Sequence, residues 1–255
     1  MRKISLVIPM YNYAARIHQT IAQIQSYCSQ HKKDWEIIFV DDGSTDNTVS
    51  VAERCIAQNP QMRVILQPYN QGKGAAVRRG LIEASGDYRI FTDCDLAYGI
   101  EQVNAIIDAL DEGVDFAFAD RRHPLSVCST ADEEEIKNYQ QKRDLMSTVL
   151  NQMIHTLGIS TVKDTQAGLK GFTGKTVNYL KRGTINGFPF DIELFAIASS
   201  NNISWKSVPV QYHLDEKNST VVPSVVVLDF FKSFVRIKRN LYLGKYELPR
   251  QELSA

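Results

Sequence analysis

The sequence predicts an α/β protein in which a mostly parallel central sheet is flanked by helices. Short apolar runs alternate with stretches whose apolar residues recur at helical spacing through the first 119 residues. Strands separated by helices of this length form right-handed β-α-β units, which cover both faces of a parallel sheet. Each predicted strand also ends in polar or turn-forming residues, and ligands of open parallel sheets bind beyond such ends.

The elements of the front half follow from these runs. The predicted strands are residues 4–8, 36–40, 64–66, 88–92 and 114–119. Helices are expected between the first four strands, over residues 17–24, 49–56 and 74–84. The first of these carries Ile17, Ile21 and Ile24 on one helical face, which is the spacing of a helix that packs on a sheet.

The pattern changes after residue 119. Residues 120–137 are polar and include the acidic run 132–135, which predicts a surface loop. A long helix is expected over residues 136–157, a mixed segment follows, and a final helix covers about 225–243. No flexible linker or internal repeat is evident, so we expect one domain over 1–220, with a front half of 1–119 and a back half of 120–220, followed by a helix and tail over 221–255.

Composition excludes several classes of protein. The chain has 255 residues, and its 29 basic residues balance 29 acidic ones, which argues against nucleic-acid binding. Its four cysteines are widely spaced, so neither a zinc site nor a disulfide framework is expected. The start of the chain does not read as a signal peptide, and no run approaches the roughly 18 apolar residues of a membrane span. We therefore expect a cytoplasmic protein.

Two carboxylates follow the fourth predicted strand, at Asp93 and Asp95. Alternate side chains of an extended segment project to the same side, so the pair suits Mg²⁺ or Mn²⁺, which take few protein oxygens and complete their shell with diphosphate and water. An Asp-x-Asp pair is common by chance, and its position at a strand end is what favours a metal site.

Other nucleotide-binding motifs fit less well. Gly72 and Gly74 lack the third glycine of the dinucleotide-binding fingerprint, and the first strand-to-helix turn, residues 9–12, contains no glycine. A P-loop is also absent. Asp46 is explained equally well as the residue that caps the following helix.

At the level of whole motifs, the chain resembles the family 2 glycosyltransferases of the GT-A fold. The resemblance rests on residues 7–12, 40–48, 70–80 and 93–95. Residues 164–172 and 188–194 are similar to the branch of dolichyl-phosphate glucosyl- and mannosyltransferases. These motifs cover nearly the whole chain in one order, with a nucleotide-sugar half in 1–119 and an acceptor half in 120–220.

The resemblance implies a set of donor-binding residues: Pro9, Tyr11, Asn12, Asp41, Asp42, Lys73, Arg78, Asp93 and Cys94. Tyr11 would stack on the base with Pro9 beside it, and Asp41 would accept a hydrogen bond from an imide N–H, which favours uracil or guanine. Asp93 and Asp95 would hold the metal on the diphosphate, where it offsets charge on the leaving group. Lys73 is alternatively a solvated charge on a helix face.

The acceptor-binding residues that the resemblance implies are Arg121, Arg122, Arg143, Ser147 and Gln166. Residues 143 and 147 share one helix face, and arginine can donate two hydrogen bonds to a phosphate. Arg143 is alternatively paired with the acidic residues 133–135. Asp95, Asp191 and Arg143 are the candidates for catalysis, although Asp191 could simply cap the helix that begins at residue 192.

The resemblance therefore implies a metal-dependent, inverting transfer of a hexose, with glucose favoured, from a UDP- or GDP-sugar to a polyprenyl or dolichyl phosphate. A phosphate oxygen is already anionic, so Asp191 would bind sugar hydroxyls rather than act as a base. Two alternatives stay open: a saccharide or glycolipid hydroxyl as acceptor, with Asp191 as its base, and a silent module that binds sugar nucleotides. The sequence leaves the oligomeric state open.

The final predicted helix is amphipathic and basic. Its apolar stripe comprises Val227, Phe230, Phe231, Phe234, Ile237 and Leu241, and the segment 229–250 holds six basic and two acidic residues. The stripe could pack on the sheet as an ordinary terminal helix, or it could lie in a bilayer interface. Because a lipid-linked acceptor must be met at a membrane surface, we expect peripheral, salt-sensitive membrane contact.

Overall fold

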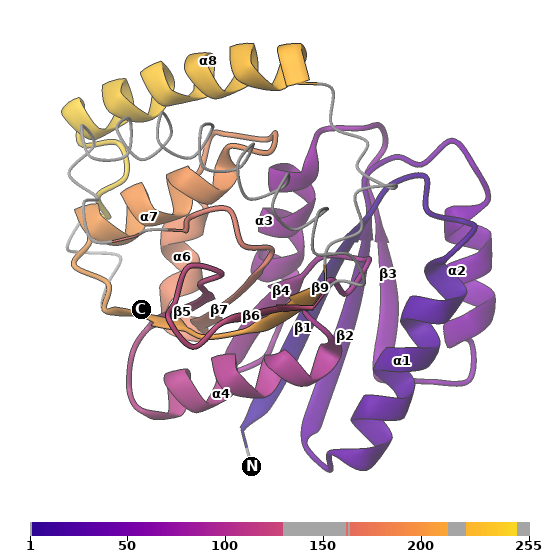
Figure 1. Cartoon of the computed structure of the whole chain (residues 1–255). Helices are drawn as coiled ribbons and strands as arrows, with labels where there is room; N and C mark the ends of the chain where they lie inside the picture. The colour runs from indigo at the N-terminus through magenta and orange to yellow at the C-terminus, as the bar shows by residue number, and fades with distance from the viewer. Residues whose placement is uncertain (1, 130–161, 163, 214–222, 249–255) are drawn as a thin grey trace.

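A seven-stranded sheet forms the centre of the molecule (Figure 1). The computed structural model describes residues 2–129, 162, 164–213 and 223–248, without the side chains of 223–228. The sheet order is β3-β2-β1-β4-β7-β5-β8, and β6 pairs with β9 beside it. The predicted helix at 136–157 lies outside the described residues.

The front half has the predicted alternation of strands and helices. Its elements are β1 (Lys3–Met10), α1 (Ile17–Gln30), β2 (Asp34–Asp41), α2 (Thr48–Ile56), β3 (Met62–Leu66), α3 (Lys73–Glu83), β4 (Tyr88–Thr92), α4 (Val103–Asp111) and β5 (Phe116–Ala119). β1 pairs in parallel with β2 and β4, and β2 pairs in parallel with β3. The mostly parallel sheet is thus confirmed, while α4 is a helix that the sequence analysis did not predict.

The back half contributes strands to the same sheet. Its elements are β6 (Val127–Ser129), β7 (Leu169–Thr173), α6 (Val177–Leu180), α7 (Phe190–Ser200), β8 (Trp205–Val208), β9 (Gln211–His213) and α8 (Pro223–Tyr242). β7 runs antiparallel between β4 and β5, which places Lys170 opposite Phe91 and Phe118. Sequence analysis missed β7 because a lysine and a glycine interrupt its apolar run.

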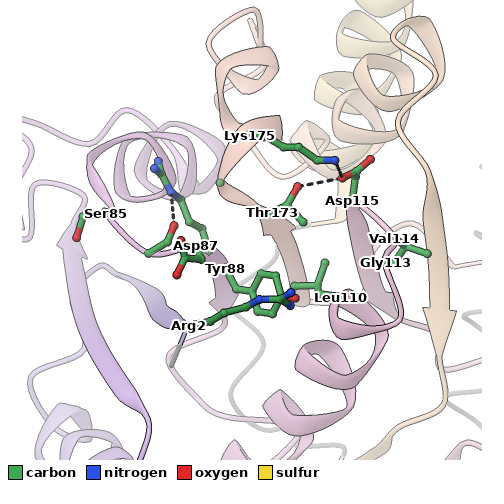
Figure 2. A pocket seen from close by; sticks show the side chains of 13 residues that line it. Arg2, Ser85, Asp87, Tyr88, Leu110, Gly113, Val114, Asp115, Thr173 and Lys175 are labelled. Carbon is green, nitrogen blue, oxygen red and sulfur yellow. Dashed lines mark hydrogen bonds and ion pairs between the residues drawn. The ribbon is translucent and has the colours of Figure 1, made fainter. Parts of the chain in front are cut away.

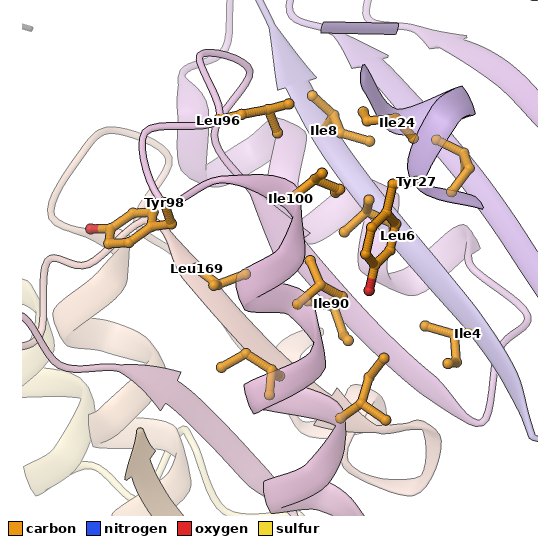
Figure 3. Packing of buried hydrophobic residues seen from close by; sticks show 14 of the residues in the cluster. Ile4, Leu6, Ile8, Ile24, Tyr27, Ile90, Leu96, Tyr98, Ile100 and Leu169 are labelled. Carbon is orange, nitrogen blue, oxygen red and sulfur yellow. The ribbon is translucent and has the colours of Figure 1, made fainter. Parts of the chain in front are cut away.

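Each face of the sheet is covered by a separate hydrophobic cluster. One cluster packs α1, α2 and α4 on the sheet, and Figure 3 shows Ile24, Ile90 and Leu169 among its members. The other packs α3, α6 and α7 on the opposite face, with Phe195 and Ile197 at its centre. Burial on both faces explains why the strands of the front half are apolar runs rather than alternating patterns.

Helix α8 packs on α7 and closes the second cluster, as Figure 1 shows. Ile237 is fully buried, and Phe230 and Leu241 pack against the same cluster. The predicted stripe of α8 is therefore mainly a packing surface, as the alternative explanation held, and only Phe231 of its described members is largely exposed. Among the described residues, no helix combines the length and apolarity that a membrane crossing requires.

Candidate active site

The carboxyl ends of β1, β2 and β4 meet at one edge of the sheet. Met10 is paired with Asp41 at the ends of β1 and β2, and β4 ends one residue before Asp93. Residues that are far apart in the sequence, such as Tyr11, Asp41 and Asp93, are consequently brought to the same edge. This is the edge at which the sequence predicted a ligand site.

A pocket of about 510 Å³ lies beside the ends of β1, β2 and β3. Its lining residues are Tyr11, Asp41, Gly43, Ser44, Thr45, Val49, Leu66, Gln67, Pro68, Tyr69 and Asn70. Two of these aromatic rings are exposed, Tyr11 to 44% and Tyr69 to 66%. Exposed rings at a concave surface are suited to stacking against a planar ring such as a nucleobase.

Asp41 is the buried carboxylate of this pocket. Ser44 donates to both of its oxygens, from its hydroxyl at 2.5 Å and from its backbone N–H at 2.9 Å. A carboxylate has about four lone-pair positions, so these two hydrogen bonds orient Asp41 and leave it able to accept another. The structure therefore places Tyr11 and Asp41 together, as the resemblance implies.

Pro9 and Asn12 support this pocket without lining it. Pro9 lies in β1 opposite Val40. Asn12 has a positive φ of 48°, and its side-chain oxygen accepts a hydrogen bond of 2.8 Å from the backbone N–H of Thr45. Asn12 thus shapes the turn that carries Ser44 and Thr45.

Asp42 does not face the pocket, although sequence analysis grouped it with Asp41. Its Oδ1 accepts hydrogen bonds from the Gln67 side chain at 2.6 Å and from the N–H of Gln71 at 2.8 Å. Its Oδ2 accepts one from the N–H of Gly72 at 2.9 Å. These bonds lower the pKa of the carboxyl, but desolvation outweighs them and raises it above its ordinary value. Asp42 holds the segment 67–72 in place.

Asp93 forms an ion pair with Lys73, the first residue of α3. The Lys73 ammonium lies 2.5 Å from Asp93 Oδ1. Although burial opposes the charged form of Lys73, the carboxylates of Asp93 and Asp191 raise its pKa. Lys73 is therefore part of the acidic site rather than a solvated helix-face charge.

Asp95 lies next to this pair and is more exposed. Its Oδ1 accepts a hydrogen bond of 3.1 Å from the N–H of Ala97. Desolvation and the nearby Asp93 charge raise the pKa of Asp95, so the two carboxylates repel each other. Two adjacent carboxylate groups under mutual repulsion fit a hard divalent cation that takes further ligands from diphosphate and water. In the described residues no three His, Cys, Asp or Glu side chains cluster as metal ligands.

Gly168 makes room for Asp93. A Cβ atom at this position would lie 1.9 Å from Asp93 Oδ2, so any other side chain would displace the carboxylate. Sequence analysis gave Gly168 no role, because only the antiparallel β7 brings the segment before it to the end of β4. This glycine is thus a determinant of the site's geometry.

Asp191 and Lys170 form a second ion pair, which is buried. Lys170 Nζ lies 2.5 Å from Asp191 Oδ1, and the two side chains are 0% and 4% exposed. Asp191 lies in the first turn of α7, where the helix dipole favours a negative charge. Burial raises the pKa of Asp191, and Lys170 and Lys73 oppose that effect.

Arg78 holds a loop beside the site. Its guanidinium donates to the carbonyl of Ile185 at 3.1 Å and to the side chain of Asn186 at 2.5 Å. The carbonyl of Asn186 in turn accepts hydrogen bonds from the N–H groups of Gly74 and Ala75 at the start of α3. Arg78 is not among the residues that line the nucleoside pocket, and its observed contacts give it a supporting role.

The remaining predicted residues have varied surroundings. Burial raises the pKa of the Cys94 thiol, and the side chain packs against the first hydrophobic cluster. Gln166 is half-buried, and its amide lies 3.4 Å from the Thr165 hydroxyl. Arg143 and Ser147 lie outside the described residues. Cys94 thus contacts the core rather than the nucleoside pocket.

Arg121 is engaged by a carboxylate of the protein itself. Its Nε and Nη2 donate to the two oxygens of Asp164 at 2.7 and 2.8 Å. In this structure the guanidinium of Arg121 therefore binds Asp164 and not a phosphate. Arg122 is half-buried, and no ion pair between described residues involves its side chain.

Another hollow of about 500 Å³ lies at the opposite edge of the sheet (Figure 2). Two of its basic side chains are in ion pairs, Lys175 with Asp115 at 2.7 Å and Arg2 with Asp111. It lies at the amino ends of β4 and β5, whereas ligands of such sheets bind at the carboxyl ends. We therefore place the active site at the edge that carries Asp41 and Asp93.

The chain is similar in sequence to dolichyl-phosphate β-glucosyltransferases. Relatives include the dolichyl-phosphate β-glucosyltransferase of Saccharomyces cerevisiae, which is 30% identical over 95% of this chain and 76% of its own length. The human dolichyl-phosphate β-glucosyltransferase is 26% identical over 98% of this chain and 79% of its own.

A solved structure has the same fold. Glucosyl-3-phosphoglycerate synthase from Mycobacterium tuberculosis, in complex with Mn²⁺, UDP-glucose and phosphoglyceric acid, superposes with a TM-score of 0.66 at 19% identity. The match covers 93% of this chain and 80% of that one. Residues 5–156 match glycosyl transferase family 2. This chain belongs to that family and is a glycosyltransferase.

Proposed function

We propose that the protein transfers glucose from UDP-glucose to a dolichyl or other polyprenyl phosphate, with a divalent cation at Asp93 and Asp95. The observation that carries the proposal is the grouping of Asp93, Asp95 and Lys73 at the sheet edge that also holds the pocket of Tyr11 and Asp41. The relatives named as dolichyl-phosphate β-glucosyltransferases support the choice of sugar and acceptor.

In the donor complex, uracil would stack on Tyr11, and its imide N–H would donate to Asp41, whose oxygens Ser44 already orients. Lys73 would exchange part of its contact with Asp93 for the diphosphate, since an ammonium is a mobile point charge on a flexible stem. A Mg²⁺ or Mn²⁺ ion held by Asp93 and Asp95 would stabilise negative charge on the departing UDP.

The reaction is a displacement at the anomeric carbon. A phosphate oxygen of the acceptor forms the new bond to carbon, and the bond from carbon to the diphosphate oxygen breaks with its electron pair leaving on UDP. One displacement from the opposite face inverts the configuration. Because the phosphate oxygen is anionic, the protein has mainly to align the two groups and screen their charges.

Asp191 would bind hydroxyls of the glucose in this reaction. It is close enough to Lys73 and Asp93 for both of their charges to affect its pKa, and its own charge raises the pKa of Lys73. Its raised pKa also suits a general base, which is the role it would take if a sugar hydroxyl were the acceptor. The identity of the acceptor therefore decides between the two roles.

We also propose that the outer face of α8 contacts an anionic membrane surface. Phe231, Val235 and Tyr242 form an outward row and are 60%, 52% and 90% exposed. The exposed basic residues around them are Lys232, Arg236, Lys238 and Arg239. Exposed apolar side chains flanked by basic ones are complementary to an interface of acyl chains and anionic headgroups. The protein would then act as a peripheral enzyme at the cytoplasmic face.

The function can be tested by measuring release of UDP from UDP-glucose with three acceptors in parallel. These are dolichyl phosphate in detergent, phosphoglyceric acid and a free saccharide. The proposal predicts release that depends on dolichyl phosphate and on Mg²⁺ or Mn²⁺. Faster release with the saccharide would instead favour the hydroxyl acceptor. In a parallel assay with GDP-glucose, release of GDP where UDP-glucose gives no release of UDP would overturn the choice of UDP.

A further inference from the structure

We propose that Lys170 is a positioning residue of the active site, which fixes one oxygen of Asp191 so that the other faces the donor sugar. This inference rests on the proposed function insofar as it assigns Asp191 to the glucose. It concerns a residue to which neither the sequence motifs nor the relatives assign a task.

Lys170 is unusually placed for a lysine. It is fully buried in β7, on the sheet face that carries the second hydrophobic cluster, and its ammonium lies 5.5 Å from the centre of the Phe91 ring. The ammonium donates to Asp191 Oδ1 at 2.5 Å and to the carbonyl of Ala167. Two of its three donors are therefore used by fixed partners.

The fold itself has little need of this ion pair. Replacing a buried ion pair by apolar side chains of similar volume is often neutral or stabilising, because desolvating two charges offsets their attraction. The neighbours of Lys170 are largely aromatic and aliphatic, and they would accommodate such a pair of side chains. A charged pair at this position is thus better explained by what it does for Asp191.

The second oxygen of Asp191 is directed by this arrangement. In the described part of the chain, Oδ1 accepts the hydrogen bond from Lys170, and Oδ2 accepts none. Lys73 and Asp93 are the other charged groups near Asp191. Negative and positive charges alternate in the order Asp93, Lys73, Asp191 and Lys170. Lys170 is the last group in this order, on the side away from the proposed metal ligands, and it holds Asp191 in place.

A carboxylate that has one oxygen fixed can hold a sugar hydroxyl in a single orientation, which is what aligns the anomeric carbon for attack. Without Lys170, the carboxylate would rotate toward Lys73 and lose that orientation. The nucleoside pocket is formed by other elements, the ends of β1, β2 and β3. Loss of Lys170 should therefore slow turnover without weakening the binding of the nucleotide.

The test is a double-mutant cycle of Lys170→Met, Asp191→Asn and the combined variant, with Lys175→Met as the matched control. Lys175 lies near the other end of β7, is exposed and pairs with Asp115 at the opposite edge of the sheet. For each folded variant, kcat and KM for UDP-glucose and the Kd for UDP are measured. If Lys170 acts through Asp191, the combined variant should turn over at the rate of Asp191→Asn alone.

We expect Lys170→Met to lower kcat at least about tenfold, which corresponds to roughly 1.4 kcal/mol, while the Kd for UDP changes less than about twofold. Lys175→Met should match the wild type. Additive losses in the cycle, or an equal loss of UDP affinity, would overturn the proposal. If Lys170→Met fails to fold, the comparison of Asp191→Asn with the combined variant still decides, since both lack the unpaired buried carboxylate.

The outcome is separable from that of the proposed function. Should the wild type fail to transfer glucose to dolichyl phosphate, the proposed acceptor is wrong. The cycle is then measured on whichever acceptor supports release of UDP, or on slow hydrolysis of UDP-glucose. Non-additivity there would support the role of Lys170 whatever the acceptor.

Discussion

Asp41 and Asp42 are adjacent in the sequence, yet they serve different parts of the structure. Asp41 is oriented toward the pocket by Ser44, whereas Asp42 accepts three hydrogen bonds from the segment 67–72. Successive residues at a strand end point in opposite directions, so neighbours with the same chemistry acquire different partners. A sequence motif identifies Asp41 and Asp42 together, whereas their contacts in the structure show that they have different roles.

At the metal site, Asp93→Asn and Asp95→Asn should each lower metal-dependent turnover by about a hundredfold or more, as loss of transition-state charge stabilisation does. The fold should persist, because both side chains lie at the surface of the sheet edge. Turnover is measured over a Mg²⁺ and Mn²⁺ titration, with the circular dichroism spectrum as the control for folding. Near-normal transfer by either variant would remove that residue from the metal site.

Gly168→Ala should be nearly as damaging, although it adds a single methyl group. That methyl would meet Asp93 Oδ2 at 1.9 Å, so the carboxylate must leave the position in which it pairs with Lys73. Gly174→Ala is the matched control, since its nearest contact is 3.2 Å away and lies far from Asp93. We expect turnover to fall at least about tenfold for Gly168→Ala, as misplacement of a catalytic group does. Equal activities of the two variants would contradict this account of Gly168.

The sequence predicted those residues of the site that lie at the end of a recognisable apolar run, because such a run marks a strand. Tyr11, Asp41, Asp93 and Asp95 each follow or end an apolar run that is recognisable without the fold. Gly168 and Lys170 were missed because their place depends on β7, whose antiparallel pairing with β4 joins segments about eighty residues apart. A pairing of that kind leaves no periodic signal in either segment.

Among the elements, α8 illustrates how amphipathicity can mislead. The stripe that the sequence singled out is largely directed at α7, and two polar residues of the same helix, Ser233 and Asn240, are also buried. Asn240 donates to Thr184 and to Tyr246, so a polar network accompanies the apolar contact. Hydrophobic spacing indicated a helix with a buried face, but it did not distinguish protein from lipid.

The membrane proposal predicts a specific loss. Replacing Phe231, Val235 and Tyr242 by serine should abolish flotation with anionic liposomes at low salt, because these side chains supply the apolar contact. Leu125→Ser is the control, since Leu125 is 73% exposed and lies outside α8. Flotation of the wild type should weaken as salt is raised. The proposal fails if the triple variant floats as well as the wild type.

Removing α8 altogether would be a poor test. Ile237 and, just beyond the helix, Tyr246 are fully buried, and the Tyr246 hydroxyl donates to Glu193 at 2.8 Å. Glu193 in turn accepts hydrogen bonds from the N–H groups of Thr184 and Ile185, which lie in the loop that caps the start of α3. A chain without α8 would lose these buried contacts together with the exposed face of the helix. A loss of membrane binding could then result from unfolding alone.

At the scale of the whole molecule, the sheet joins the two predicted halves. β7 from the back half lies between β4 and β5 from the front half, so neither half completes the sheet by itself. The pair of Arg121 and Asp164 adds a further connection, between the end of β5 and the segment before β7. The halves expected from the sequence are therefore functional regions within one structural unit.

This pair predicts a pH dependence of stability. Although burial favours the neutral acid, Arg121 lowers the pKa of Asp164 from 3.8 to about 2. The ionised form is thus preferred in the folded state, so the pair stabilises the fold above the unfolded pKa, and this contribution is lost as pH falls through the folded pKa. The shift corresponds to about 2 kcal/mol.

Urea unfolding of the wild type and of Asp164→Asn at several pH values should reveal the pH-dependent contribution of this ion pair to stability. The free energies of unfolding should differ by about 2 kcal/mol near neutral pH and converge as the pH approaches about 2. Asp111→Asn is the matched control, because the exposed pair with Arg2 should contribute little at any pH. A difference between wild type and Asp164→Asn that is independent of pH would show that Asp164 is not preferentially ionised in the fold.

The most direct test of the central claim is the transfer of labelled glucose from UDP-glucose into a product that extracts with dolichyl phosphate. The purified chain is assayed with Mg²⁺ or Mn²⁺, with excess EDTA, and as the Asp93→Asn variant. We predict label in the lipid phase with metal, and loss of that label with EDTA or the variant. Release of UDP without label in the lipid, or transfer that persists in EDTA, would contradict a metal-dependent glucosyltransferase with a lipid-phosphate acceptor.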